Sequence, residues 1–157
     1  MNKNKLSTVR GMHDLYGEDH TKQQSVIDNF IKTVTLFNFT PINTPIMEHS
    51  DVFLRTLGNS SDVVTKEMYS FKDRNDDELC LTPEGTASCM RLAFENNLIY
   101  DRGIKKNRLY YYAPMFRHER PQKGRLRQFN QFGLEYFGFS GISSEIELIV
   151  LINKLFS

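Results

Sequence analysis

The chain has 157 residues, 39% of them hydrophobic and 25% charged, and its net charge is +1. These values are those of an ordinary soluble domain, and the length predicts one domain that buries about 70% of its unfolded surface. No apolar run approaches the roughly 20 residues that span a bilayer, and the start lacks the apolar stretch of a signal peptide, so we expect a cytoplasmic location and no membrane partner.

The first predicted elements are a helix and an extended segment. Residues 18–37 carry apolar side chains at helical spacing, which gives a helix one apolar face. Residues 39–46 include Pro41 and Pro45, which exclude a helix and favour a strand at the edge of a sheet. By themselves these residues indicate an ordinary unit of a helix packed on a strand.

A short hairpin is expected next. Residues 67–72 and 78–81 have strand-like sequence, and a turn-forming cluster at 73–77 joins them. Cys80 and Cys89 lack a metal-ligand spacing, so we expect free thiols in a reducing compartment. The four histidines are scattered along the chain and suggest no zinc site, so no metal-binding residues are predicted.

A second helix is predicted at about residues 87–99, directly after the segment 82–86. Its buried face is expected to consist of Met90, Ala93, Phe94 and Leu98. Glu84 stands beside a proline at the start of this helix. An acid at such a position normally interacts with the helix dipole in the first turn.

A basic loop between two strands is the most informative feature of the sequence. Residues 117–127 carry five Lys or Arg and one Glu, so the segment holds +4 while the remainder of the chain sums to −3. Such a local excess indicates a polyanionic partner, usually phosphate. Pro121 and Gly124 predict a loop, and the aromatic segments at 109–116 and 129–137 predict the strands.

Alternate residues of the second strand share a face. One face consists of Arg127, Phe129, Gln131, Gly133, Glu135 and Phe137, and the other of Gln128, Asn130, Phe132, Leu134 and Tyr136. The first face suits a ligand laid along the strand, because Phe129 offers a plane for stacking and Gly133 a gap for close approach. Gln131 and Glu135 suit an amine. A solvated antiparallel face is an equal alternative.

The last predicted element is a helix that opens with a capping box of Ser144 and Glu147. Its apolar residues cover nearly every side and are Ile146, Leu148, Ile149, Val150, Leu151, Ile152, Leu155 and Phe156. This pattern predicts burial all round. The sequence stops at Ser157 with no segment to cover the helix, so in this chain apolar side chains are expected to be exposed.

Four segments, in this order, resemble the histidyl-tRNA synthetase family of class II aminoacyl-tRNA synthetases. They are residues 10–14, 66–71, 83–87 and 115–129, followed by Gln131, Gly133 and Glu135. The fourth segment is similar to motif 2 of that family and contains the unbroken stretch Arg120-Pro121-Gln122-Lys123-Gly124-Arg125. This stretch is far more specific than the general class II motif, and the resemblance covers nearly the whole chain.

The resemblance implies ATP-dependent activation of histidine to histidyl-adenylate and its transfer to the 3′ end of tRNA(His). It makes Arg117 the catalytic residue, which would hold the α-phosphate of ATP and the substrate carboxylate. Histidine would be bound by Glu84, Gly85, Thr86, Arg117, Gln131 and Glu135. ATP, carried with Mg²⁺, would be bound by Arg117, Glu119 and Phe129, and the tRNA acceptor end by Gln122, Lys123 and Arg125.

The resemblance also implies an α+β fold, with a mixed and mainly antiparallel sheet flanked by helices, of the class II catalytic-domain type. Residues 1–157 would be the N-terminal portion of that domain, with motifs 1 and 2 but without motif 3 and the anticodon-binding domain. We therefore expect the chain alone to be inactive. The segment ending at Pro45 resembles motif 1, which implies a homodimer. Thr82 departs from the family, which commonly has arginine there, and leaves the charge balance around Glu84 open.

Two other functions stay open. A synthetase-like regulatory subunit of ATP phosphoribosyltransferase would bind ligands without charging tRNA, but it is not expected to keep the complete basic stretch. A non-enzymatic nucleic-acid-binding module would use the loop alone. Against it, Glu84 and Glu135 would repel phosphate and suit a small cationic ligand.

Overall fold

The computed structural model describes residues 6–58, 61–99 and 106–157. Its centre is an antiparallel pair of ten-residue strands, β5 (Asn107–Phe116) and β6 (Gln128–Phe137), in register from Asn107 opposite Phe137 to Phe116 opposite Gln128. A two-residue strand, β1 (Thr40–Pro41), adds to β5 in the parallel direction. The two long strands predicted on either side of the basic loop are confirmed.

A smaller antiparallel sheet lies beside the first. It has the order β2-β4-β3 and is formed by β2 (Met47–His49), β4 (Glu78–Leu81) and β3 (Ser70–Lys72). Thr82 follows β4 and joins the two sheets, because its N–H donates to Ile46 O at 2.9 Å and its carbonyl accepts from Phe116 N at 2.9 Å. The expected α+β class with a mixed, mainly antiparallel arrangement of strands is confirmed.

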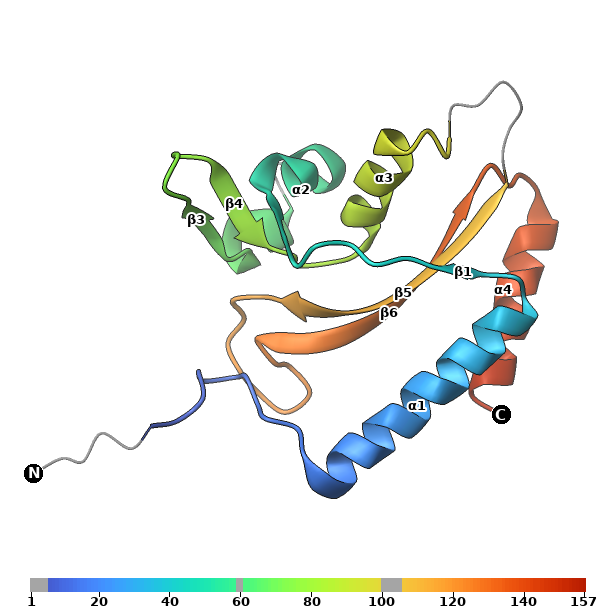
Figure 1. The fold of residues 1–157 in the computed structure, drawn as a ribbon, viewed down its shortest axis with the longest axis horizontal. Helices are drawn as coiled ribbons and strands as arrows, with labels where there is room; N and C mark the ends of the chain where they lie inside the picture. Colours follow the sequence, from blue (N-terminus) through green and yellow to red (C-terminus); the bar gives the residue numbers. More distant parts are fainter. Residues whose placement is uncertain (1–5, 59–60, 100–105) are drawn as a thin grey trace, which may run out of the picture.

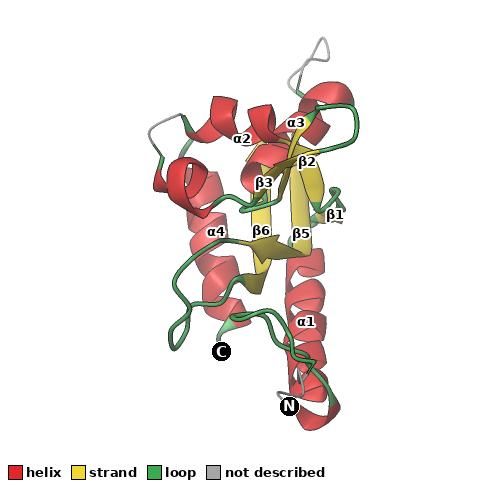
Figure 2. Cartoon of the chain, turned by 90° about the vertical axis from the view of Figure 1, so that its left-hand side faces the viewer, coloured by secondary structure: helices red, strands yellow, loops and turns green. Residues whose placement is uncertain are grey.

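The helices form layers on the two sides of the β5–β6 pair (Figure 1). On one side lie α1 (Gly17–Leu36) and α4 (Ile142–Leu155), and on the other α2 (Ser50–Leu57), α3 (Thr86–Glu95) and the smaller sheet. In the view turned by 90°, α2 and α3 lie above β5 and β6, α1 lies below them and α4 lies beside β6 (Figure 2). A face of β6 therefore points toward each layer.

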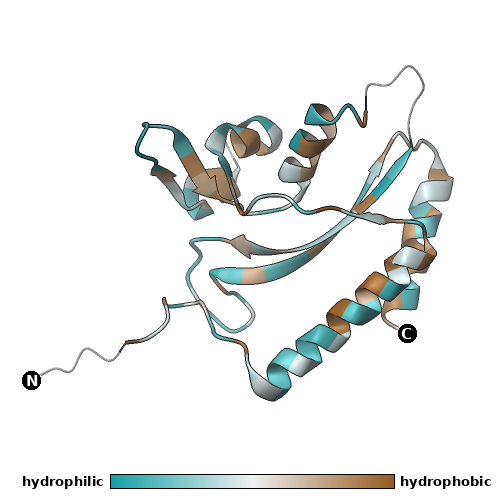
Figure 3. Cartoon of the chain, in the orientation of Figure 1, coloured by the Kyte–Doolittle hydropathy of each residue, from teal (hydrophilic) through white to brown (hydrophobic). Residues whose placement is uncertain are grey.

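The packing on these two faces follows the predicted alternation along β6. On the first face, Phe132 packs with Phe30 of α1 at a ring-centroid distance of 4.3 Å, within a cluster that includes Leu151 of α4. On the second face, Phe129 packs against a buried cluster that contains Met115. Burying a large apolar side chain contributes about 1.5–3 kcal/mol. Apolar positions recur along α1 and α4 in Figure 3.

The element boundaries differ from the predictions in three places. The extended segment 39–46 forms only the two-residue β1, although it does lie at the edge of its sheet as expected. The first hairpin strand begins at Ser70, because Val63–Glu67 is helical. α3 ends at Glu95, and Asn97 then takes a left-handed conformation with φ of 53°.

Two predictions about the helices are wrong, one about a buried face and one about a cap. Phe94 was expected on the buried face of α3, but its side chain is 45% exposed while Ala93 is buried. In α4 the capping box does not form, since the helix begins at Ile142 and the Ser144 hydroxyl donates to Gly141 O at 2.9 Å. Glu147 instead accepts from Arg108 at 2.8 Å.

Burial all round α4 is also not observed, although the exposure of apolar side chains is. Of the α4 residues only Leu151 is buried in the described chain, because one side of the helix packs on α1 and β5 and the other faces solvent. The exposed apolar residues are Ile142, Ile146, Ile149, Val150 and Ile152, with Phe156 directly after the helix. The apolar pattern of residues 146–156 predicted the helix, but it could not predict how many of the helix side chains are buried by the rest of this chain.

Candidate active site

The basic loop is closed by backbone hydrogen bonds at its base and at its tip. Arg117 N donates to Arg127 O at 2.9 Å, and a reciprocal pair joins Gln122 and Arg125 at 3.2 and 2.9 Å. Gly124 in that turn has φ of 80°, a conformation that glycine adopts without steric cost. The predicted basic loop is therefore an ordered loop between β5 and β6.

The N-terminal segment supports the base of this loop. Gly11 has φ of 85°, and its carbonyl accepts from Arg127 N at 2.7 Å. A Cβ at this position would lie 2.9 Å from Pro121 Cγ, so only glycine allows the approach. The base is held from a second direction by Glu67, whose carbonyl accepts from His118 N at 2.6 Å. Three of the four segments that carry the family resemblance thus meet at the loop.

Arg117 directly follows β5, and its side chain extends toward Pro83. Its Nε donates to Pro83 O at 2.9 Å, and its guanidinium lies 5.1 Å from the centre of the Phe129 ring. This distance allows a cation–π contact. Within the described part of the chain the two terminal nitrogens of Arg117 have no hydrogen-bond partner, which leaves a two-pronged donor for an anion.

A pocket of about 340 Å³ lies beside this arginine. It is lined by Arg117, Glu119, Gly124, Arg125, Leu126 and Phe129. The pocket thus brings together the three residues predicted to bind ATP. Arg125 Nη1 lies 3.4 Å from the Glu119 carboxylate, and Arg127 Nε donates to Glu119 O at 3.1 Å. The pocket offers an aromatic plane, a carboxylate and two arginines at one place.

The residues predicted to bind histidine also come together, from segments almost fifty positions apart. The Thr86 hydroxyl donates to Glu135 at 2.9 Å, and Gly85 N donates to Gln131 Oε1 at 3.2 Å. Burial raises the pKa of the Glu135 carboxyl, the nearby charge of Glu84 raises it further, and the hydrogen bond from Thr86 opposes both. A partly desolvated acid of this kind favours a cation beside it.

Glu84 has a structural role in the ligand-free chain. Its carboxylate accepts from Thr86 N at 2.7 Å and from Ala87 N at 2.8 Å, at the start of α3. The interaction with the helix start that the sequence predicted is therefore confirmed. Contact between Glu84 and a substrate stays a prediction.

Sequence reasoning missed Tyr111 and misjudged Gly133. Gly133 was expected to leave a gap for a ligand, but the Tyr111 ring fills that space, and a Cβ on Gly133 or on Gly85 would overlap it. Tyr111 is 5% exposed and stands directly opposite Gly133 in the β5–β6 register. An aromatic residue paired with a glycine across a predicted hairpin is the signal that would have found it.

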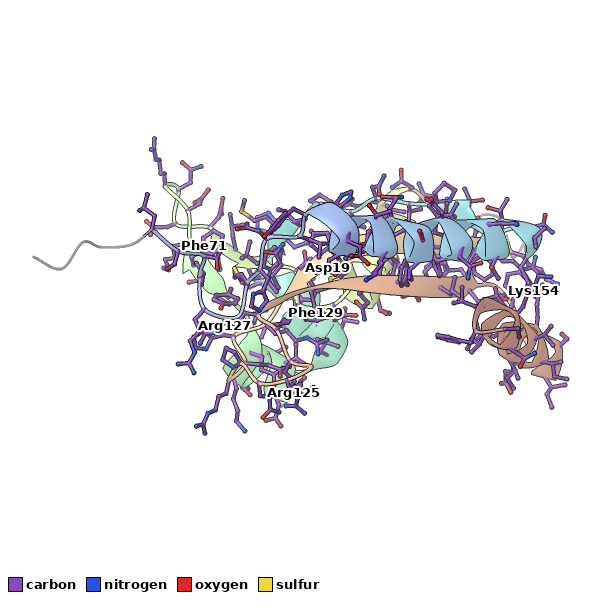
Figure 4. The ribbon with its side chains drawn as sticks, turned by 90° about the horizontal axis from the view of Figure 1, so that it is seen from below. Asp19, Phe71, Arg125, Arg127, Phe129 and Lys154 are labelled. Carbon is purple, nitrogen blue, oxygen red and sulfur yellow. The ribbon has the colours of Figure 1, made fainter. Side chains whose placement is uncertain are left out.

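The residues predicted to face tRNA lie at the outer end of the loop. Gln122, Lys123 and Arg125 are all exposed. Figure 4 shows Arg125 farther from the β6 ribbon than Phe129, while Arg127 lies near the start of the strand. Gln122 and Lys123 thus lie outside the pocket, whereas Arg125 is exposed and also lines it.

Thr82 is buried rather than at the site surface. It is 2% exposed, and its hydroxyl donates to Pro45 O at 3.3 Å. The departure from arginine at this position therefore places a small polar side chain in the junction between the two sheets.

Another pocket, of about 690 Å³, lies between α2 and α3. Arg91 and Ala87 of α3 and Val52 of α2 are among its lining residues, and none of the residues predicted to bind a ligand is. Among the described residues no group of three or more His, Cys, Asp or Glu side chains could hold a metal ion, and no helix is long and apolar enough to cross a membrane.

Comparison with known proteins places this geometry in context. The family model described as Histidyl-tRNA synthetase matches residues 11–157. The chain is 49% identical over 156 residues to the histidine–tRNA ligase of Buchnera aphidicola subsp. Schizaphis graminum (strain Sg), covering 99% of this chain and 35% of the relative. It is 46% identical over 150 residues to that of Hydrogenovibrio crunogenus, with 96% and 34% covered.

Solved structures have the same fold. The apo histidyl-tRNA synthetase of S. aureus matches with a TM-score of 0.79 and 32% identity, covering 96% of this chain and 34% of that one. An ATP phosphoribosyltransferase regulatory subunit/histidyl-tRNA synthetase from Bacillus halodurans matches with a TM-score of 0.79 and 25% identity, covering 96% and 37%. The chain spans about a third of the length of the relatives it matches.

Proposed function

The chain belongs to the histidyl-tRNA synthetase family, and on that premise we propose that it supplies half of the active site of a longer enzyme, a histidine–tRNA ligase. The enzyme activates histidine with ATP and transfers the histidyl group to the 3′ end of tRNA(His). The chain contributes the adenine-stacking plane, one phosphate-binding arginine and the acids that bind the amino acid.

The observation that supports this proposal is that one face of β6 carries an aromatic ring beside an arginine near one end and an acid near the other. Phe129 lies under the Arg117 guanidinium, and Glu135 accepts from Thr86 six residues further along the strand. Six residues of strand span roughly 20 Å at about 3.3 Å each, which is room for a nucleotide and an amino acid end to end. Gln131 lies between the two ends.

The chemistry requires positive charge more than any other feature. An oxygen of the histidine carboxylate attacks the α-phosphorus of ATP, the bond from that phosphorus to the bridging oxygen breaks, and pyrophosphate leaves. Negative charge grows on the phosphoryl oxygens, so prepositioned donors lower the barrier. The sequence has no glycine-rich phosphate loop, and Arg117 takes this role with its planar, two-pronged guanidinium.

The substrate amine binds at the acidic end of the face. Glu135 and Glu84 offer negative charge to the ammonium group, and Thr86 and Gln131 supply uncharged hydrogen-bonding groups. Glu119 accepts from the adenine amino group at the other end, where Phe129 stacks on the ring. This arrangement gives two chemically different subsites, one beside Arg117 and Phe129 and the other beside Glu135.

Partners and location follow from the same proposal. The tRNA acceptor end reaches the exposed tip of the loop, where Gln122, Lys123 and Arg125 contact it. Magnesium would enter with the ATP phosphates and would supply charge neutralisation there. Two copies associate through the region of α1 and β1, and the enzyme acts in the cytoplasm.

A charging assay tests the proposed function. The full-length enzyme that contains this chain is expected to attach labelled histidine to tRNA(His), and replacing Lys123, which does not line the pocket beside Arg117, by glutamate should lower that charging while leaving adenylate formation unchanged. A full-length protein that binds histidine and stimulates ATP phosphoribosyltransferase but charges no tRNA would establish the regulatory alternative instead.

A further inference from the structure

A turn near the N-terminus, residues 9–12, packs against the base of the basic loop, although none of these four residues lines the pocket beside Arg117. The turn is closed by a hydrogen bond from Met12 N to Val9 O at 2.9 Å, and Gly11 within it is buried. In Figure 4 the N-terminal segment passes beside Arg127. The roles proposed above give this N-terminal turn no part in the reaction.

Gly11 contacts the basic loop on both of its sides. Its carbonyl accepts from Arg127 N at 2.7 Å, on the side that leads into β6. A Cβ at this position would lie 2.9 Å from Pro121 Cγ, on the side that comes from β5, and 3.1 Å from Arg127 Cγ. Because these distances leave no room for a methyl group, an alanine here has to displace Pro121 or Arg127.

Arg127 connects this contact to two residues of the nucleotide subsite. Its carbonyl accepts from Arg117 N at 2.9 Å, and its Nε donates to Glu119 O at 3.1 Å. Glu119 N in turn donates to Arg117 O at 2.8 Å, so the Glu119 backbone is held on both sides. The Glu119 side chain, which is 15% exposed, lines the pocket from this position.

Arg117 depends less on the N-terminal turn than Glu119 does. The Arg117 side chain has an anchor outside the loop, since its Nε donates to Pro83 O at 2.9 Å. The two backbone bonds described for Glu119 run to Arg117 and Arg127, within the loop itself. A shift of the loop at Gly11 should therefore displace the Glu119 carboxylate more than the Arg117 guanidinium.

We propose that Gly11 is a positioning residue for the nucleotide base, which acts through Arg127 to set the Glu119 carboxylate against the adenine amino group. The inference rests on the proposed function and adds the N-terminal turn to the nucleotide subsite. A turn with a purely structural role would affect every nucleotide alike. A turn that positions Glu119 has to affect the discrimination between bases, because Glu119 contacts the base and not the phosphates.

The substitution Gly11→Ala tests the inference in the full-length enzyme. Histidine-dependent nucleotide–pyrophosphate exchange is measured with ATP and with inosine triphosphate, whose base has a carbonyl oxygen in place of the amino group. The ratio of kcat/KM for ATP to that for inosine triphosphate should fall roughly 10-fold, the order expected when a hydrogen bond to a charged group is weakened. The KM for histidine should stay within about twofold, because the turn contacts β6 at its start and Glu135 lies near its end.

Gly17→Ala is the matched control. Gly17 also has a positive φ, 61° against 85° for Gly11, but nothing lies within 4 Å of a Cβ there. Alanine therefore meets backbone strain at both positions and a steric clash only at Gly11. The control should leave the ratio for the two nucleotides within about twofold of that of the unsubstituted enzyme.

Arg127→Met is a second test, and it does not depend on whether the Gly11 variant folds. This change keeps the stem of the side chain and deletes the donor to Glu119 O. The ratio of kcat/KM for ATP to that for inosine triphosphate should again fall roughly 10-fold. Loss of a positive charge that acts only on the phosphates would instead lower the activity with both nucleotides equally.

Four results would overturn the inference. They are an unchanged ratio in Gly11→Ala or in Arg127→Met, an equal fall in Gly17→Ala, a parallel loss of activity with both nucleotides, and an unsubstituted enzyme that uses both nucleotides equally well. Each of them leaves histidine-dependent exchange, and with it the proposed function, intact. If the unsubstituted enzyme shows no histidine-dependent exchange, the proposed function falls and the inference falls with it.

Discussion

Arg117 and Glu135 place a positive and a negative charge on the same side of the β5–β6 pair. The arginine leaves two donors free beside Phe129, and the acid lies partly buried beside Thr86. The alternation along β6 predicted from sequence that Phe129, Gln131 and Glu135 would share a face, and it was right because period-two geometry is set by the backbone. Tyr111 was missed because its neighbour Gly85 is distant in sequence, and only tertiary folding brings the two together.

At this scale, replacing Arg117 by alanine should lower adenylate formation by the full-length enzyme about 10²–10³-fold, the usual effect of removing one transition-state donor. ATP–pyrophosphate exchange measures it. Arg120→Ala, an exposed arginine of the same loop, is the control and should leave exchange near the unsubstituted level. Exchange by the Arg117 variant within twofold of the unsubstituted enzyme would remove the arginine from its assigned role.

Glu135→Gln keeps the shape of the side chain and deletes its charge. Histidine affinity should fall by roughly 2–4 kcal/mol, the cost of truncating one partner of a buried charge pair, while ATP affinity hardly changes. Calorimetry with each ligand measures both values. The exposed Glu145 gives a matched control as Glu145→Gln. Loss of ATP binding with histidine binding intact would mean that the two subsites are assigned the wrong way round.

The raised pKa of Glu135 gives this prediction a pH dependence. The ammonium needs the ionised acid, so histidine affinity should weaken as the pH falls through the raised pKa, and Glu135→Gln should lose this dependence. For folding the sign is reversed. A carboxyl whose folded pKa lies above its unfolded value stabilises the protein at low pH and loses that contribution as the pH rises through the folded pKa. At pH 7 the glutamine variant should therefore be no less stable.

Among the elements, α3 is held to the smaller sheet by a largely buried ion pair. Arg91 Nη2 lies 2.6 Å from Glu48 of β2, and the two side chains are 23% and 6% exposed. This pair could not be predicted from local sequence, because Glu48 and Arg91 are 43 residues apart. The same limit applies to α4, where the predicted capping box does not form because the helix begins at Ile142, and Glu147 accepts from Arg108 of β5.

Arg91→Ala should lower the free energy of unfolding by about 3 kcal/mol, because it leaves the Glu48 carboxylate buried and unpaired. Urea denaturation followed by circular dichroism measures the change. Arg55→Ala is the control, since the Arg55–Asp51 pair is exposed at 83% and 68% and should contribute at most about 1 kcal/mol. Equal losses in the two variants would show that the Glu48 pair stabilises no more than a surface pair.

For the whole molecule, the outer side of α4 decides how the 157-residue chain behaves alone. Ile149 is 66% and Val150 52% exposed on that side. Apolar surface of this kind usually binds a partner. The helix was predictable from its local pattern, but what covers it was not, since that depends on residues outside the helix. The proposed association near α1 and β1 and this face both favour more than one copy.

We expect the isolated 157-residue chain to fold and to self-associate. We also expect it to charge no tRNA, because it offers one phosphate-binding arginine, whereas ATP binding is expected to need arginines from both halves of the full active site. Sedimentation velocity measures the association. Ile149→Glu should shift the chain toward the monomer, while Asn153→Glu, on an exposed polar residue of the same helix, should not. A clean monomer before any substitution, or charged tRNA made by this piece alone, would contradict the expectation.

One face of β6 is proposed to carry an amino-acid subsite for histidine next to an ATP subsite. ATP–pyrophosphate exchange by the full-length enzyme, measured with each of the common amino acids in turn, tests it most directly. Exchange is expected to depend on histidine and to be far faster with histidine than with any other amino acid. Exchange that is fastest with a different amino acid, or that histidine does not stimulate, would contradict it.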